Sequence, residues 1–144
     1  MPDSAQVLVV DDNPRMVTVI KRWLVRAGYQ VIGVTTVQEA LEALTAKGIA
    51  WVITDLMMPT GDGMDILAYA RTHHPQAKII IMTAFGSDAM RQRAFVHGAY
   101  AFLSKPFSGE GLLAILTQEP SSAPSGPTAG GDQYTPSHPQ RGRP

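Results

Sequence analysis

The sequence predicts an α/β domain in which helices cover both faces of a parallel β-sheet. Short runs rich in Val, Ile and other strand-forming residues alternate with longer stretches whose apolar residues recur at helical spacing. The run 79–82 is apolar at every position, as expected of a strand buried on both faces of a parallel sheet. With 144 residues, 44% of them hydrophobic, the chain is long enough for one domain with a substantial core.

Five short runs have the composition of strands. They are residues 7–10, 29–34, 51–54, 78–82 and 100–104. Helices are predicted between and after them, at 14–27, 37–47, 64–73, 87 or 88 to 97, and 109–119. The first helix has the clearest boundaries, because Asp12-Asn13 offers an Asx cap and Pro14 suits the first helical position. Gly28 suits the position just after its last turn, and 59–63 is predicted to be a turn-rich loop.

Strands and helices in this alternation predict a doubly wound, three-layer α/β/α domain with five strands and five helices. Among the common strand orders, the flavodoxin-like order 2-1-3-4-5 fits the number of strands. We expect this domain to span residues 1–119. From Pro120 onward, 16 of 25 residues are Pro, Gly, Ser or Thr, so 120–144 is expected to be a disordered tail or linker.

Charge and composition narrow the possible functions. Twelve basic and twelve acidic residues cancel and we expect no basic stripe, which argues against direct contact of this segment with nucleic acid. The absence of cysteine excludes disulfides and Cys-ligated zinc. The apolar runs are too short to span a membrane, and Asp3 stands where a signal peptide would be basic. The expectation is a cytoplasmic protein without membrane contact.

Polar side chains follow four of the predicted strands, at the point where each strand ends. They are Asp11 and Asp12, Asp55, Thr83, and Lys105. The carboxyl ends of parallel strands meet in one crevice, which is where such folds place their sites. We therefore expect these side chains to lie close together.

This set of groups predicts a Mg²⁺-dependent phosphoacceptor. Adjacent carboxylates repel each other unless they share a cation, and their hard oxygen atoms suit Mg²⁺. Each signal has a simpler interpretation: Asp12 as a helix cap, Asp55 as the start of a turn, or Lys105 as part of an exposed turn. Their occurrence together at four strand ends favours the site.

The chain resembles the receiver domain of two-component response regulators over residue 6 to about residue 119. Four blocks are similar to that family. They are Val-Asp-Asp-Asn-Pro at 10–14, Thr-Asp-Leu-Met-Met-Pro at 54–59 with Asp62-Gly63, Met-Thr-Ala at 82–84, and Gly-Ala-Tyr-Ala-Phe-Leu-Ser-Lys-Pro-Phe at 98–107.

The resemblance implies that Asp55 accepts a phosphoryl group from a histidine kinase, a phosphotransfer protein or a small acyl phosphate. It implies that Mg²⁺ is bound directly by Asp12 and Asp55, through water by Asp11, and by the backbone carbonyl of Met57. Lys105 would contact a phosphate oxygen. Such a protein is a phosphoacceptor that assists its own phosphorylation and dephosphorylation, rather than an enzyme.

The family also implies a switch. Thr83 would hydrogen-bond the phosphoryl group and move toward it, and Phe102 stands at the position of the switch aromatic; the simpler interpretation of Phe102 is a permanently packed core ring. The Lys105–Pro106 bond is expected to be cis. The surface formed by the fourth helix, the fifth strand and the fifth helix would then bind a downstream target or a second copy of the chain.

Three other functions remain to be weighed. The block at 83–87 resembles receivers of nitrogen-regulation-type activators, so the chain is either a stand-alone receiver or the receiver fragment of such a larger transcriptional activator. An Asp-nucleophile phosphatase would have Asp-x-Asp, and here Met57 takes the second position. An FMN-binding flavodoxin-like protein is disfavoured because Asp11 and Asp12 would repel the phosphate.

Overall fold

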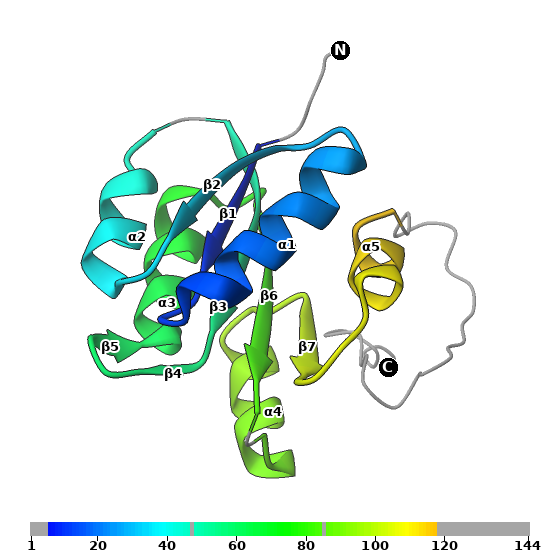
Figure 1. The fold of residues 1–144 in the computed structure, drawn as a ribbon. Helices are drawn as coiled ribbons and strands as arrows, with labels where there is room; N and C mark the ends of the chain where they lie inside the picture. The colour runs from blue at the N-terminus through cyan, green and yellow to red at the C-terminus, as the bar shows by residue number, and fades with distance from the viewer. Residues whose placement is uncertain (1–5, 47, 85, 118–144) are drawn as a thin grey trace.

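The computed structural model describes residues 6–46, 48–84 and 86–117 (Figure 1). Its strands are β1 (Gln6–Val10), β2 (Gln30–Val34), β3 (Ile49–Asp55), β4 (Met57–Met58), β5 (Gly61–Asp62), β6 (Lys78–Thr83) and β7 (Ala101–Ser104). Its helices are α1 (Pro14–Arg26), α2 (Val37–Ala43), α3 (Gly63–His73), α4 (Asp88–Val96) and α5 (Gly109–Thr117).

The main sheet has the strand order β2-β1-β3-β6-β7, and all its strands are parallel. With the small β4–β5 ribbon set aside, this is the predicted order 2-1-3-4-5. The predicted fold class is therefore confirmed. In Figure 1, α1 and α5 cover one face of the sheet, and α2, α3 and α4 lie on the other side.

The core consists of two apolar layers, one on each face of the sheet. Along β6 the side chains alternate between them: Ile79 and Ile81 belong to the layer beneath α2, α3 and α4, whereas Ile80 and Met82 belong to the layer beneath α1 and α5. All four are fully buried. This confirms the prediction of a strand buried on both faces, because a strand between two helical layers has no solvent side.

Helix α1 begins and ends where its sequence signals place it. Asn13 is the N-cap, and its side chain accepts a hydrogen bond from the backbone N–H of Arg15 at 3.0 Å. Pro14 follows as the first helical residue. Gly28 has φ +102°, a conformation that favours glycine. Because Asn13 is the cap, the interpretation of Asp12 as a cap is wrong.

Two local predictions differ from the structure. Helix α2 ends at Ala43 with Leu44 as its cap, where the sequence predicts a helix to residue 47, which lies outside the described residues. The chain turns there because the Thr45 hydroxyl and backbone N–H both bond to the carbonyl of Glu42, three residues back. The loop after β3 forms the two-stranded ribbon β4–β5 where only turns were expected. The predicted end of α5 at residue 119 and the predicted tail lie outside the described residues.

Among the helices in the described ranges, none is long and apolar enough to cross a membrane.

Candidate functional site

The three predicted carboxylates meet at one end of the sheet. Val10 of β1 lies opposite Thr54 of β3, so the residues that follow them, Asp11 and Asp55, are neighbours. One side-chain oxygen from each of Asp11, Asp12 and Asp55 lies within 4.8 Å of the others. Asp11 is fully buried, Asp55 is 6% exposed, and Asp12 is exposed. The triad therefore opens to solvent on the Asp12 side.

Asp11 is held by backbone groups on both sides. Its Oδ1 accepts a hydrogen bond from the N–H of Asn13 at 2.9 Å. Its own N–H donates to the carbonyl of Val34, the last residue of β2, at 3.2 Å. The position of this buried carboxylate is therefore fixed by the start of α1 and the end of β2.

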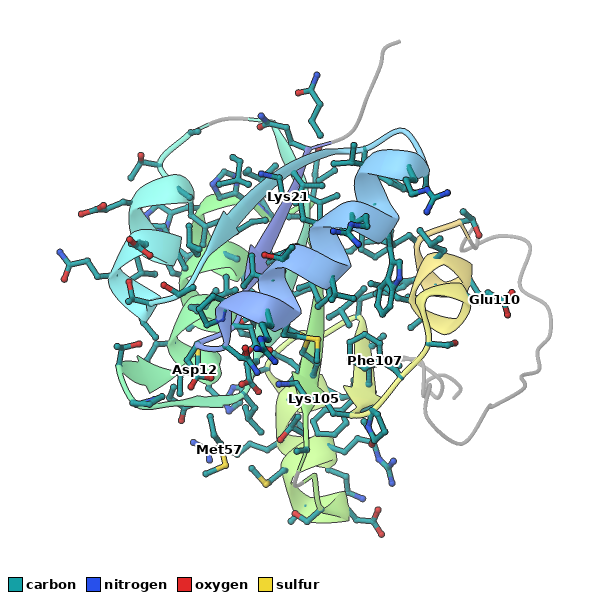
Figure 2. The ribbon with its side chains drawn as sticks, viewed as in Figure 1. Asp12, Lys21, Met57, Lys105, Phe107 and Glu110 are labelled. Carbon is teal, nitrogen blue, oxygen red and sulfur yellow. The ribbon has the colours of Figure 1, made fainter. Side chains whose placement is uncertain are left out.

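Lys105 lies between two of the carboxylates. Its Nζ is 2.8 Å from Asp11 Oδ2 and 3.4 Å from Asp55 Oδ2. It follows β7, and its backbone N–H donates to the carbonyl of Thr83 on the neighbouring strand at 2.9 Å. The Lys105–Pro106 peptide bond is cis. Figure 2 shows Asp12, Met57 and Lys105 at the same end of the sheet, although they come from three separate segments of the chain.

Burial and mutual repulsion shape the charges of the site. Burial raises the pKa of Asp55, the nearby Lys105 charge lowers it, and the charges of Asp11 and Asp12 raise it, so the pKa of Asp55 lies above its ordinary value. Burial alone lowers the pKa of Lys105, but its hydrogen bond to Asp11 and the charges of Asp55 and Asp11 outweigh burial, so that pKa lies above its ordinary value. Lys105 is therefore a cation at neutral pH, beside a cluster of carboxylates with a larger total charge.

The donor set fits a hard cation. Three carboxylates with ligand atoms this close lower their mutual repulsion when a divalent ion lies between them, and oxygen is the preferred ligand of Mg²⁺ and Ca²⁺. Asp11, Asp12 and Asp55 thus form an acidic triad suited to bind a divalent cation.

The predicted switch residues, Thr83 and Phe102, are both buried and both lie against Gly86. Thr83 ends β6 and is 1% exposed, and Phe102 on β7 is 2% exposed. Gly86 lies against both: a Cβ at Gly86 would be 2.7 Å from Phe102 Cε2 and 3.0 Å from Thr83 Cγ2. The Phe102 ring is thus packed in the core, as its simpler interpretation has it. Sequence reasoning did not identify Gly86 as a site residue, although it belongs to the block at 83–87.

The loop that follows Asp55 depends on a second glycine, Gly63. In the sequence, Gly63 belongs to the block Asp62-Gly63, for which sequence reasoning gave no structural reason. A Cβ at Gly63 would be 2.2 Å from the carbonyl oxygen of Asp55. The N–H of Gly63 donates to the carbonyl of Leu56 at 2.7 Å, which closes the base of the β4–β5 ribbon. Within the ribbon, the side chain of Met57 is 58% exposed.

Helix α1, which begins beside the triad, has a basic outer face. Its exposed cations are Arg15, Lys21, Arg22 and Arg26. The sequence has no acidic residue between Asp12 and Glu39, and within the described ranges none of these cations makes an ion pair. The expectation of no basic stripe misses this face, because helical spacing places Arg15, Arg22 and Arg26 on one side of α1, with Lys21 at its flank.

Comparison with known proteins gives one consistent family. The response regulator receiver domain family matches residues 7–117 of the chain. The response regulator protein FleR of Pseudomonas aeruginosa is 32% identical over 131 residues, which cover 88% of this chain and 28% of FleR. The chain spans less than half the length of the curated relatives it matches.

Solved structures agree in fold. A response regulator from Burkholderia pseudomallei, with a phosphorylated aspartic acid, calcium ion and citrate, has a TM-score of 0.75 and 30% identity over 80% of this chain and 68% of that one. The beryllofluoride-activated NtrC4 receiver domain dimer has a TM-score of 0.72 and 33% identity over 77% of this chain and 93% of that one.

Proposed function

Because this chain belongs to the response regulator receiver domains, which are phosphoacceptors rather than enzymes in the ordinary sense, we propose that Asp55 accepts the phosphoryl group. One observation supports this assignment above the others. Asp55 ends a buried strand, its side-chain oxygen lies within 4.8 Å of oxygens of Asp11 and Asp12, and Lys105 Nζ is 3.4 Å from its Oδ2. A carboxylate that shares a cation site with two others and has a lysine beside it is suited to attack phosphorus, because phosphoryl transfer depends on positioning and charge neutralisation.

In the proposed reaction, an oxygen of Asp55 attacks the phosphorus atom in line with the leaving group. The new bond joins this oxygen to phosphorus, and the P–N bond of a phosphohistidine donor breaks, with its electron pair staying on the imidazole. Lys105 binds one phosphoryl oxygen through its ammonium group. Thr83 donates a hydrogen bond to another.

We assign the metal as Mg²⁺, with Asp12 and Asp55 as direct ligands, Asp11 acting through water, and the backbone carbonyl of Met57 completing the protein ligands. When bound, this ion supplies positive charge to the phosphoryl oxygens. The exposure of Asp12 supports the assignment, since Mg²⁺ retains several waters and needs an opening to solvent.

Phosphorylation would then be transmitted through Thr83 and Phe102. Movement of Thr83 toward the phosphoryl group opens space beside Phe102, into which the ring can turn. The position of Gly86 supports this coupling, because Gly86 lies against both side chains. Any other residue at position 86 would bring its Cβ too close to Phe102 and Thr83. The surface that changes is formed by α4, β7 and α5.

We propose a histidine kinase or phosphotransfer protein as the donor, and a downstream target or a second copy of the chain as the partner of the α4-β7-α5 surface. The basic face of α1 is suited to an acidic protein partner rather than to nucleic acid. Helix α1 begins at the carboxylate triad, which would repel a phosphate backbone. A cytoplasmic location follows for a protein phosphorylated by an ATP-dependent kinase.

The receiver of a longer regulator is the second candidate. The share of FleR that the chain covers, 28%, favours it. In both cases we keep the division into a receiver domain at 1–119 and a linker or tail at 120–144.

The test is intact-protein mass spectrometry after incubation with acetyl phosphate and Mg²⁺. We expect a single phosphoryl adduct on the wild type that is lost in Asp55→Ala and absent when EDTA is added. Asp65→Ala is a matched control, because Asp65 is an exposed carboxylate in the first turn of α3, outside the β4–β5 ribbon and the triad.

An adduct that persists in Asp55→Ala would place the acceptor elsewhere and contradict the assignment. An adduct that forms equally well in EDTA would contradict the role of the metal.

A further inference from the structure

The tip of the β4–β5 ribbon is bonded to helix α2. The hydroxyl oxygen of Thr60 accepts a hydrogen bond from the backbone N–H of Val37, the first residue of α2, at 3.1 Å. Gly61 packs on the same residue: an ideal Cβ there would lie 2.9 Å from Val37 Cγ2, and Gly61 has φ +153°. In Figure 1 the ribbon lies beside the start of α2.

This contact joins two segments that both reach the carboxylate triad. On one side, the segment that leads into α2 follows Val34, whose carbonyl accepts the N–H of Asp11 at 3.2 Å. On the other side, the ribbon begins two residues after Asp55, where Met57 pairs with Asp62 and Met58 with Gly61. The Thr60–Val37 bond therefore connects the segment that holds Asp11 through Val34 to the loop that follows Asp55.

The ribbon needs such an anchor. Each of its strands has only two residues, and a two-stranded ribbon is only marginally stable by itself. Its base is fixed by the bond from Gly63 N–H to the Leu56 carbonyl at 2.7 Å. Its tip is fixed by Thr60.

We propose that Thr60 is a positioning residue for the metal site: its hydroxyl fixes the ribbon against α2 and thereby holds the backbone carbonyl of Met57 in place for the cation. The inference rests on the proposed function, because it takes Met57 as a metal ligand. Thr60 itself does not touch the ion.

The simpler role for Thr60 is to cap α2, and α2 already has its own cap. The Thr36 hydroxyl accepts a hydrogen bond from the N–H of Glu39 at 3.0 Å, and Glu39 Oε1 accepts one from the N–H of Thr35 at 3.2 Å. Thr36 and Thr60 are thus two threonine hydroxyls that bond to the first turn of the same helix. Only Thr60 belongs to the ribbon, so Thr36 is a matched control.

The experiment measures the affinity for Mg²⁺ alone by isothermal titration calorimetry, with no phosphoryl donor, together with the Tm of each metal-free variant. We expect Thr60→Val to bind Mg²⁺ about fivefold more weakly, the scale of one lost hydrogen bond. Thr60→Ser keeps the acceptor and should stay within about twofold of the wild type. Thr36→Val should lower Tm and leave the Mg²⁺ affinity within about twofold.

Three outcomes would overturn the inference. Thr60→Val could bind Mg²⁺ as the wild type does, in which case Thr60 is only a structural cap. Thr36→Val could weaken binding as much as Thr60→Val, in which case the effect comes from the stability of α2. A wild type that binds no Mg²⁺ would overturn the proposed function as well, so the two failures are distinguishable.

A second measurement needs no variant. Because coupling between two sites is reciprocal, Mg²⁺ should slow hydrogen exchange of the Val37 amide in the wild type, as measured by NMR. The Glu39 amide, bonded to Thr36, should change much less. Equal exchange of Val37 with and without Mg²⁺ would count against the inference even if Thr60→Val failed to fold.

Discussion

At the scale of single residues, Lys105 is the group that makes the carboxylate cluster compatible with folding. It is closer to Asp11, the more deeply buried partner, at 2.8 Å than to Asp55 at 3.4 Å. Asp11 therefore has a permanent counter-charge within the chain, whereas Asp55 is less well compensated and its pKa is raised. Of these two buried carboxylates, Asp55 is therefore the one that gains more from a bound cation.

Asp55→Asn should stabilise the metal-free domain at pH 7. Since burial raises the pKa of Asp55 above its ordinary value of 3.8, ionising this group opposes folding. The contribution of Asp55 to stability is fully present below pH 3.8 and is lost as the pH rises through the higher pKa of the folded state. We expect Asp55→Asn to raise Tm by roughly 4 °C at pH 7 and by much less near pH 3, as measured by thermal denaturation.

Adding Mg²⁺ supplies the control for this prediction. The ion should raise the Tm of the wild type and have little effect on Asp55→Asn, because the variant loses one ligand. A variant less stable than the wild type at pH 7 without metal would show that the Lys105 ion pair outweighs the burial of Asp55.

At the scale of elements, the loop between β3 and α3 is the least regular part of the site and the most tightly constrained. Gly63 is both the first residue of α3 and the residue whose N–H closes the ribbon. The Asp62 side chain caps α3 by accepting the N–H of Met64 at 2.8 Å. The motif Asp62-Gly63 thus has a physical reason, which is to start a helix directly beneath the backbone of Asp55.

Gly63→Ala should destabilise the domain by more than about 2 kcal/mol, because the added Cβ would be 2.2 Å from a backbone oxygen that cannot turn away. Urea denaturation measures this change. Gly111→Ala in α5 is the control: its Cβ would meet only the Ser108 hydroxyl at 3.2 Å, and the helix favours alanine, so stability should stay within about 1 kcal/mol. Equal stability of the two variants would show that the β3–α3 loop shifts without penalty.

At the scale of the whole molecule, the two helical layers differ in charge and in exposure. The α1 side has the basic face described above, whereas α4 presents Val96. Val96 is 80% exposed, which is more than the other exposed large hydrophobic residues among those the structure describes. An exposed apolar residue on a helix of the proposed output surface is suited to a partner or to a second copy of the chain.

We expect the domain to form dimers when activated by beryllofluoride and Mg²⁺, as the activated NtrC4 receiver domain does, and Val96→Lys to weaken them at least tenfold. Sedimentation velocity with and without the activator measures the shift. Val25→Lys on α1 is the control, since Val25 is 51% exposed on the opposite side of the sheet. A wild type that binds the activator and stays monomeric would favour a separate downstream target.

The order of elements was predictable from the sequence because it depends on local patterns. The periods of 2 and 3.6, the Pro14 and Gly28 boundaries, and the all-apolar run 79–82 need no knowledge of distant contacts. The meeting of Asp11, Asp55 and Lys105 was predictable for a related reason, since parallel strands place their carboxyl ends at one edge.

Contacts between residues far apart in the chain could not be predicted from the sequence and are known only from the folded structure. Lys105 reaches Asp11 across 94 positions, and Thr60 accepts the N–H of Val37 across 23, and neither pairing has a local pattern. The same holds for the contact of Gly86 with Phe102. The sequence thus determined which groups this protein brings to its site, and packing decided which of them touch, because contact geometry is fixed only when the layers close around the sheet.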